Sequence, residues 1–482
     1  MINIGNTTPL LNILSIFPIS GWDAQMKFSL SVKDIQGSHD KLQRFHVKYT
    51  LHFLTKTREM VQQSFQYIQG KLLGKGRGNM CLYAKDVPDC NNQSLQHFVS
   101  NSPWNHRPVL DHIQRDVAEA VGDENNGSIH VDECCFPKQG KDSVGAASQY
   151  CGRLGKIANC QVGVFLGYTK DSYRTLIDER LFLPEEWIKD KVRRRKCGVP
   201  WYVRFKKKTE LAWEMIVHVQ KRDKIPFGWV GIDCFYGRDS WLRNKIDKQG
   251  LIYIADIPCN LGVWLECPET GVPTRKKGVR GRNPTREKVI DGIESIKVRD
   301  IKDQLDGEKW HHVFIRDTER RELWSDMACL RVFPSEDNGL PGDECWLIIR
   351  KDPKSNEIKY QLSNASPDTS IDHLAEMSGS RYWIERTFED GKGIAGLADY
   401  QVRNWTGWHH HITITLLAML YLMVLSIDLG KKADFLTVQD VKEIFEVIMP
   451  KRKVTSEELV QLILEKHKRR LSARLSHHRR SR

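Results

Sequence analysis

The sequence feature that most constrains the fold is a continuous apolar run, Ile412–Ile427, which reads ITITLLAMLYLMVLSI. A helix that is apolar on every side must be enclosed, either by lipid or by the core of a large domain. The run is shorter than the roughly 20 residues that a membrane span requires. We therefore predict that residues 408–428 form a fully buried core helix, which a chain of 482 residues is long enough to surround.

The region before residue 123 has a helical pattern. Its apolar residues recur at steps of three and four, at Leu42, Phe45, Tyr49 and Phe53. Two further helices are expected at Ser94–Ser100 and Pro108–Val121, on either side of a turn. This arrangement is typical of a helix-turn-helix that reads DNA, and equally of a simple helical bundle.

Strands are expected from residue 128 onward, because short runs there are rich in Val, Ile and aromatic residues. They are Ser128–Glu133, Gln161–Gly167, Tyr173–Leu181, Trp229–Asp233 and Leu251–Asp256. Helices are expected between them at Thr209–Asp223 and Asp239–Lys248. Strands and helices that alternate around one sheet predict an α/β class.

A second group of strands interrupts this pattern. Turn clusters separate three further candidates, Trp310–Ile315, Cys345–Arg350 and Glu357–Leu362, which predicts a mostly antiparallel β insertion. Helical patterns return at 370–392, 408–428, 437–448 and 456–471.

The chain is basic, with a net charge of +13 and an isoelectric point near 9.1. A stretch rich in Gly and Pro carries the cations Arg275, Lys276, Lys277, Arg280 and Arg282, and residues 451–482 carry a second excess of Lys and Arg. Such charge is typical of a soluble protein with a basic surface and also of a protein that binds nucleic acid. A basic loop favours contact with a partner, whereas the basic C-terminal segment also fits a solvated helix end.

The twelve cysteines show no Cys-x-x-Cys pair, and two of them, Cys134 and Cys135, are adjacent. This spacing disfavours both a zinc site and a disulfide framework. Scattered free thiols favour a reducing cytosol.

Asp132 and Asp233 lie at or next to the ends of two of the expected strands, Ser128–Glu133 and Trp229–Asp233. A carboxylate at the end of a largely apolar segment is costly unless it is paired, bound to a metal or open to solvent. Strand ends are also where the sites of α/β proteins are usually built. Each aspartate taken alone equally fits a helix cap or a turn.

A third carboxylate, Glu385, lies in the helical stretch that reads RYWIERTFEDGK. At 100° per residue, Arg381, Glu385 and Lys392 fall within about 40° of one helix face, beside an apolar anchor. The simpler interpretation is a surface ion pair between Arg381 and Glu385. Gly391 and Gly393 could also end the helix before Lys392.

Three carboxylates from two strands and a helix suit Mg²⁺ or Mn²⁺, and two such ions would support phosphodiester chemistry.

Several longer motifs resemble one family, the DDE-superfamily insertion-sequence transposases, in the cut-and-paste branch with a β-strand insertion before the last acid. The resemblance covers most of residues 90–430. It rests on the runs LQHF (95–98), SPW (102–104), HVDE (130–133), FPKQGK (136–141), SVG (143–145), YCGRLGK (150–156), NCQVGVF (159–165), LPEEW (183–187) and YGR (236–238).

The resemblance implies a ribonuclease H-like catalytic core whose three acids, Asp132, Asp233 and Glu385, bind Mg²⁺ or Mn²⁺, with two ions per site. The branch signature Tyr-x2-Arg-x3-Glu-x6-Lys places Arg381 and Lys392 on the DNA backbone. This chain departs from the signature at its first position, where Ser378 replaces a tyrosine that positions DNA phosphate.

The domains implied are a helical N-terminal DNA-binding region (1–125), the catalytic core (126–262 and 367–430), the β insertion (263–366) and a basic helical C-terminal region (431–482). The basic loop, Arg275–Lys288, would add DNA surface.

The function implied is cleavage at the ends of a mobile element, followed by transfer of the ends into target DNA. The partners expected are the terminal inverted repeats and the target DNA, with the protein acting as a dimer or higher complex in the prokaryotic cytoplasm. Two alternatives stay open: a repair or junction-resolving nuclease on the same fold, and an inactive DNA-binding descendant of a transposase.

Other polar and aromatic residues have two interpretations each. His130 shares a strand face with Asp132, so it lines the site or is packed and hydrogen-bonded. The consecutive His409, His410 and His411 do not share a helix face, which favours packing or DNA contact over a metal cluster. Three tryptophans of the insertion would stack on a flipped base or pack in the core: Trp310, Trp324 and Trp346.

Overall fold

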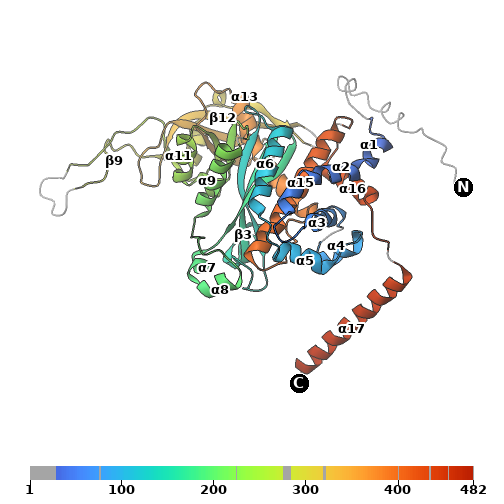
Figure 1. Ribbon diagram of the computed structural model, residues 1–482. Coiled ribbons are helices and arrows are strands. Elements are labelled where there is room, and N and C mark those ends of the chain that lie inside the picture. Colours follow the sequence, from blue (N-terminus) through green and yellow to red (C-terminus); the bar gives the residue numbers. More distant parts are fainter. Residues whose placement is uncertain are drawn as a thin grey trace.

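The computed structural model describes residues 29–74, 78–223, 225–274, 284–318, 322–399, 401–433, 436–453 and 455–480. Its strands join mainly in one twelve-stranded sheet, and helices pack against that sheet (Figure 1). Most strand pairs are antiparallel. The expected α/β class is confirmed.

The centre of the sheet has the strand order β4-β3-β1-β5-β6. These strands are β1 (Ser128–Pro137), β3 (Lys156–Lys170), β4 (Tyr173–Phe182), β5 (Trp229–Ile232) and β6 (Ile252–Asp256). β1 runs antiparallel to β3 and parallel to β5, which in turn runs parallel to β6. A short strand, β2 (Ala147–Cys151), pairs with the beginning of β3. All five expected strands are therefore present, and β1 and β3 are longer than the sequence predicted.

The strands of the insertion extend the same sheet beyond β6. Three of them were expected: β11 (His311–Asp317), β13 (Cys345–Lys351) and β14 (Ile358–Ser363). Three others were not: β7 (Gly262–Trp264), β10 (Ile296–Lys297) and β12 (Glu322–Pro334). β14 joins them to the centre by pairing antiparallel with β6. A separate ribbon, β8 (Thr270–Gly271) with β9 (Lys288–Val289), projects from this side of the molecule (Figure 1).

The predicted core helix is α15 (Trp405–Gly430). Among the helices of the described residues it alone is long and apolar enough to cross a membrane, but 83% of its most apolar window is buried by the rest of the protein. Asn404 caps its first turn by accepting a hydrogen bond from the Gly407 amide. The expected core helix is confirmed.

The helices of the N-terminal region pack around α15 as a bundle (Figure 1). They are α1 (Val32–Gln36), α2 (Ser38–Val47), α3 (Val61–Leu73), α4 (Met80–Asp86), α5 (Asn92–Ser100) and α6 (His106–Val121). Leu42, Tyr49 and Phe53 are fully buried there, as their spacing predicted. Past α15, α16 (Val438–Ile448) joins the bundle, and α17 (Ser456–Arg480) extends away from the body.

The remaining helices lie along the sheet or at its ends. They are α7 (Glu185–Lys189), α8 (Lys191–Lys196), α9 (Lys208–His218), α10 (Cys234–Gly237), α11 (Ser240–Lys248), α12 (Val298–Ile301), α13 (Ile371–Ser380) and α14 (Tyr382–Gly393). The helix expected at Thr209–Asp223 ends in a π-helical turn from Val219. The helix expected at 370–392 is divided at Arg381 into α13 and α14.

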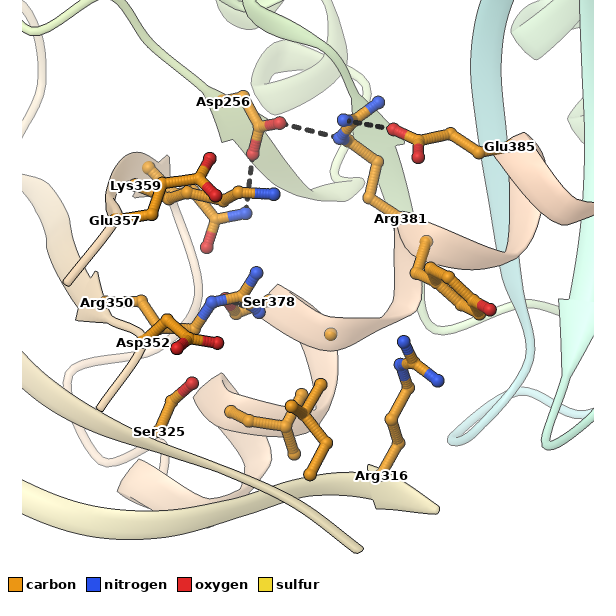
Figure 2. A pocket seen from close by; sticks show the side chains of 15 residues that line it. Asp256, Arg316, Ser325, Arg350, Asp352, Glu357, Lys359, Ser378, Arg381 and Glu385 are labelled. Atoms are coloured by element: carbon orange, nitrogen blue, oxygen red, sulfur yellow. Dashed lines mark hydrogen bonds and ion pairs between the residues drawn. The ribbon is translucent and has the colours of Figure 1, made fainter. Parts of the chain in front are cut away.

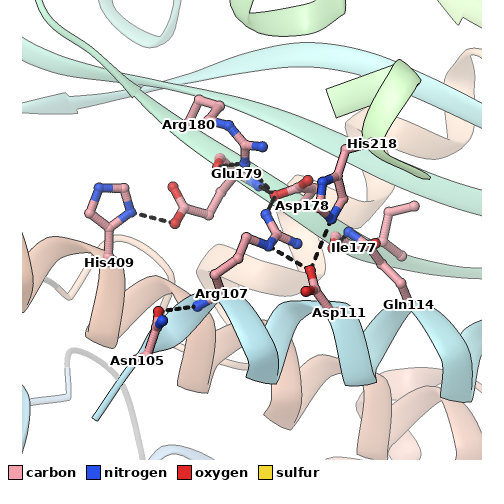
Figure 3. A network of polar contacts seen from close by, with 10 residues as sticks. All are labelled: Asn105, Arg107, Asp111, Gln114, Ile177, Asp178, Glu179, Arg180, His218 and His409. Carbon is pink, nitrogen blue, oxygen red and sulfur yellow. Dashed lines mark hydrogen bonds and ion pairs between the residues drawn. The ribbon is translucent and has the colours of Figure 1, made fainter. Parts of the chain in front are cut away.

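A buried polar network joins the helical bundle to the sheet (Figure 3). Arg107 of α6 donates from Nε to Asp111 at 2.6 Å and from Nη1 to Asp178 of β4 at 2.7 Å. Arg180 also reaches Asp178 at 2.7 Å, and His218 at the end of α9 lies 2.9 Å from Asp111. Burial raises the pKa of Asp178, but the guanidinium groups of Arg180 and Arg107 outweigh it and hold that pKa at about 2.

This network predicts a large stability loss when its central cation is removed. The substitution Arg107→Met leaves two buried carboxylates short of a partner, and breaking a buried pair in this way costs about 3–5 kcal/mol. Urea unfolding followed by circular dichroism would measure the loss. Lys248→Met, at an exposed position of α11, is the control. A loss no larger than that of the control would contradict the assigned role of the network.

Candidate active site

Strand pairing places Asp132 and Asp233 next to each other. Val131 of β1 pairs with Ile232 of β5 in parallel register, so the aspartates that follow occupy neighbouring strands. Neighbouring strands lie about 4.8 Å apart. Each carboxylate follows a fully buried residue, Val131 or Ile232, because the strands are apolar up to that point. Asp132 and Asp233 are far apart in the sequence, but in the folded protein they lie side by side at one edge of the parallel strands.

Burial is the main influence on the protonation of the two aspartates. Burial and, after it, the neighbouring charge of Asp233 raise the pKa of Asp132 to about 7, while Arg381 acts in the opposite direction. Burial also raises the pKa of Asp233. Two carboxylates with raised pKa values in one place form a site that gains from a bound cation.

Asp233 also caps a short helix, as an isolated aspartate could. Its Oδ1 accepts hydrogen bonds from the amides of Phe235 and Tyr236 at the start of α10, each at 3.0 Å. Both bonds use the same oxygen, so the cap fixes the carboxylate orientation without using Oδ2. The structural and the catalytic interpretations of Asp233 are therefore compatible.

Glu385 lies on α14, with its side chain 53% exposed, and is held by Arg381 (Figure 2). The Nη2 of Arg381 lies 2.7 Å from Glu385 Oε1, which is the i,i+4 ion pair expected from the sequence. The Nε of the same guanidinium lies 2.6 Å from the carboxylate of Asp256 at the end of β6. Arg381 therefore bridges an acid of the sheet and the acid of the helix.

Arg381 is also attracted by Asp132 and Asp233. Burial lowers the pKa of Arg381, but the charges of four carboxylates outweigh it and raise that pKa well above the usual value: Asp256, Glu385, Asp132 and Asp233. One guanidinium is thus placed among the three acids singled out in the sequence and a fourth, Asp256, that was not.

Comparison with known proteins gives the family. The DDE superfamily endonuclease family matches residues 51–322, more than half of the chain. The chain belongs to this family. The matched segment includes Asp132 and Asp233 and ends before Glu385. A search of the curated proteins gives no match. Among solved structures, the piggyBac transposase in a synaptic complex with hairpin DNA aligns over 86% of this chain and 75% of its own, with a TM-score of 0.37 and 10% identity.

Members of the DDE endonuclease family generally use divalent metal ions. The donors present fit that chemistry, because carboxylate oxygens are the ligands that Mg²⁺ and Mn²⁺ prefer. Asp132, Asp233 and Glu385 are the residues that would hold the ions. Asp256 is less available, since it accepts from both Arg381 and Gln361, the latter at 2.6 Å.

Lys392 lies within α14, which continues to Gly393 in spite of Gly391. Its ammonium lies 5.4 Å from the centre of the Phe388 ring. Burial raises the pKa of the Cys134 thiol, and the nearby Lys392 ammonium partly offsets this rise. Cys134 is two residues after Asp132 on the same strand, so Lys392 lies beside the strand that carries the first acid. This is a suitable place for a cation that holds DNA phosphate.

Ser378, at the departure from the signature, is buried and accepts a hydrogen bond from Nη1 of Arg350 at 3.0 Å. Both residues line a cavity of about 170 Å³ that also reaches Arg381 and Glu385 (Figure 2). On the same cavity, Arg316 stacks on Tyr382, with its guanidinium carbon 3.5 Å from the ring centre. In place of a tyrosine hydroxyl, this chain presents arginine side chains from β11 and β13 to the cavity.

The remaining sequence predictions have different outcomes. Arg275, Lys276, Lys277, Arg280 and Arg282 lie outside the described residues. His130 is fully buried and lies within hydrogen-bond distance of the hydroxyls of Ser128 and Thr169, at 2.9 and 3.2 Å, so it is packed.

Each of the three consecutive histidines has its own buried partner. His409 lies 2.6 Å from Glu179, His410 stacks on Trp104 at 3.7 Å, and His411 lies 2.9 Å from the hydroxyl of Tyr67. Packing, one of the two interpretations favoured for them, is confirmed.

The three tryptophans of the insertion make local contacts. Trp346 donates to the Ser366 carbonyl at 3.0 Å, and Trp324 stacks on His312 with ring centres 5.4 Å apart. Trp310 is half-buried against the main core. Trp324 is the most exposed, at 39%.

Sequence reasoning missed two candidate functional features. Asp256 ends an apolar strand in the same way as Asp132 and Asp233, so the same signal was available for it. The second is a basic arm, defined here as residues 189–208, which reads KDKVRRRKCGVPWYVRFKKK and includes α8. Its Trp201 is 81% exposed, although Arg194 and Arg204 both donate to the Trp201 carbonyl and fix the backbone there. The density of Lys and Arg beside Trp201 and Tyr202 was the signal.

The raised pKa of Asp132 predicts how stability depends on pH in protein stripped of divalent cations. The folded-state pKa, about 7, lies above the unfolded value near 3.9, so the folded protein binds more protons between those limits. Stability should therefore fall as the pH rises from about 4 to about 7. Asp132→Asn should remove this loss and stabilise the protein at pH 8 by on the order of 2 kcal/mol, discounted for partial exposure.

Urea unfolding at pH 4 and pH 8 in the presence of a chelator would measure the effect. Asp372→Asn, at an exposed position of α13, controls for the removal of one negative charge. The interpretation fails if Asp132→Asn has the same stability relative to the wild type at both pH values.

Proposed function

We propose that this DDE endonuclease is a transposase that cleaves DNA at the ends of a mobile element and joins the ends to target DNA. The observation that carries the proposal is the position of Arg381 among Asp132, Asp233, Glu385 and Asp256. A group of acids at one sheet edge, facing a helix with its own acid, is suited to hold two divalent cations.

Each side chain then has a role. Asp132, Asp233 and Glu385 would hold the cations, which when bound activate the attacking oxygen and stabilise the leaving one. The cap of α10 keeps Asp233 in one orientation, and the ion pair with Arg381 keeps Glu385 near the sheet edge. Lys392 and the cavity residues Arg316 and Arg350 would hold the phosphate backbone, which positions DNA without reading its sequence.

The architecture proposed is a ribonuclease H-like core, 126–262 and 367–430, with an insertion at 263–366. Support comes from the family and from the arrangement of β1, β5 and α14, which carry the acids. The insertion strands β11 to β14 join the sheet at β6 and bring Arg316 and Arg350 to the cavity beside Glu385. The helical regions at 1–125 and 431–482 are proposed to bind DNA in a dimer or higher complex.

Catalysis by these acids predicts a loss of cleavage without loss of binding. Asp132→Asn and Glu385→Gln should each lower cleavage in Mg²⁺ by at least about a thousandfold, because a residue that acts in a catalytic unit disables the whole unit. The substrate would be DNA carrying the element ends found in the genomic flanks of the gene. Glu389→Gln is the matched control, since Glu389 is an exposed acid one turn along α14 that pairs with Arg386. Cleavage by Glu385→Gln at the control's rate would show that the acid assignment is wrong.

Strand transfer separates the proposal from a repair or junction-resolving nuclease. Wild-type protein supplied with pre-cut ends and a target plasmid should give joined products in Mg²⁺, and Glu385→Gln should give none. Cleavage without joining would favour the nuclease alternative. The absence of both reactions, with end binding retained, would favour an inactive DNA-binding descendant.

The basic arm is proposed as an additional DNA surface, because exposed cations beside an exposed aromatic residue suit both phosphate and base contact. Changing the exposed Lys191, Arg195 and Lys207 together to Gln should weaken binding to duplex DNA. The slope of log affinity against log salt should become shallower by roughly 2 to 3, since each phosphate contact contributes about 0.9. Fluorescence anisotropy at several salt concentrations would measure the slope.

A charge-matched control changes three exposed lysines of the core outside the arm to Gln: Lys221, Lys245 and Lys248. If both triple variants change the salt slope equally, general charge rather than the arm accounts for binding.

A further inference from the structure

Three buried cysteines from different strands meet on the side of β1 away from Asp132. Cys135 lies in β1, Cys151 ends β2 and Cys160 lies in β3. Their exposed fractions are 6%, 0% and 0%, and the three sulfur atoms all lie within 4.8 Å of one another. The spacing in the sequence gives no sign of this cluster, because strand pairing and not a Cys-x-x-Cys motif brings the thiols together.

The sheet register explains why the thiols share one face. Cys135 pairs with Val162 of β3, and Cys160 is two residues before Val162, so both side chains point to the same side. Cys151 comes from the strand on the other edge of β3, where the chain turns into the 3-10 turn Gly152–Leu154. Each cysteine is therefore held by a separate part of a rigid sheet.

Packing alone is a weak explanation for the cluster, although buried thiols often act as small apolar groups. The backbone contacts offered to the sulfur atoms are long: Cys135 lies 3.7 Å from the Tyr150 carbonyl and Cys160 lies 4.0 Å from the Gln149 carbonyl. A hydrogen bond from the Cys160 thiol lowers the pKa of Cys135. Thiolate is the form that binds metals.

We propose that Cys135, Cys151 and Cys160 form a binding site for a thiophilic d10 ion, with Zn²⁺ as the biological occupant. Three atoms that are at most 4.8 Å apart have a common point within about 2.8 Å of each, close to the Zn–S distance of about 2.3 Å. A small inward movement of the side chains completes three bonds. The thiols release their protons to solvent as the ion binds, and water or an added thiol takes the fourth position.

This site is chemically distinct from the carboxylate site. Soft sulfur ligands select Zn²⁺ and related ions, whereas carboxylates select Mg²⁺ and Mn²⁺. An ion held by β1, β2 and β3 would cross-link the part of the sheet that carries Asp132, and would stabilise the folded protein by binding to it alone.

Cd²⁺ is the probe for the test, because sulfur-bound Cd²⁺ gives an ultraviolet charge-transfer band that carboxylate-bound Cd²⁺ does not. Reduced, chelator-treated full-length protein should develop this band up to one ion per chain and should unfold at a higher temperature. Zn²⁺ should compete the band away. Cys135→Ser and Cys160→Ser should lose the band, while Cys345→Ser, at a buried position of β13, should keep it.

A second measurement on the wild type covers the case in which a serine variant fails to fold. Alkylation at a urea concentration that exposes buried thiols of the metal-free protein, followed by peptide mass spectrometry, should show that Cd²⁺ protects Cys135, Cys151 and Cys160 and leaves the exposed Cys81 reactive. Absence of the band, or protection that does not include these three residues, would overturn the proposal. DNA cleavage is not a readout here, so failure of this site leaves the proposed function unaffected.

Discussion

Repulsion between the carboxylates of Asp132 and Asp233 is the constraint on which the rest of the site depends. Parallel pairing of β1 with β5 forces the two acids together, and their partial burial reduces the screening of their charges by water. Loss of either charge by protonation would relieve the repulsion, and the raised pKa of Asp132 shows how near the site is to that state. Arg381 offsets part of the charge, because its guanidinium is attracted by both aspartates while it bonds to Asp256 and Glu385.

The position of Arg381 depends in turn on the fold around it. Arg381 stands at the junction of α13 and α14, and α14 rests on the sheet through Ile384 and Phe388, both buried. Phe388 meets Phe165 of β3 edge-on, with ring centres 5.5 Å apart, and Phe165 lies opposite Asp132 in the strand register. The contact between Phe388 and Phe165, which fixes the position of α14, is thus adjacent to Asp132. Removing it would move Glu385 without touching any charged group.

The sequence predicted those parts of the structure that local patterns determine. Asp132 and Asp233 were found because each ends an apolar run, and the helix of Glu385 was found from a periodicity of 3.6 residues. The core helix α15 was recognisable because a run that is apolar on every side has few possible environments.

Contacts between distant segments could not be predicted in this way. The bond from Arg350 to Ser378 and the stacking of Arg316 on Tyr382 join strands of the insertion to α13 and α14, and no periodicity encodes those pairings. The outcome for His130 was left open for the same reason, because its partner Thr169 lies on another strand. Asp256 is different, since its local signal was present, but its contacts with Arg381 and Gln361, which distinguish it from a turn residue, could not be predicted.

The two faces of β1 have different chemistry. Side chains alternate along a strand, so Asp132 and Cys134 face α14, where the Lys392 ammonium interacts with the Cys134 thiol and lowers its pKa. Glu133 and Cys135 face the other side, where Glu133 pairs with Lys208 at 2.6 Å and Cys135 meets Cys151 and Cys160. In the two proposals made above, one face would hold hard cations through carboxylates and the other would hold a soft ion through thiols. Because both ligand sets are attached to the same strand and the strand is held on both edges, a shift of β1 that improved one set would disturb the other. The pairing of β1 with β3 and β5 thus couples the position of the carboxylate site to that of the cysteine cluster.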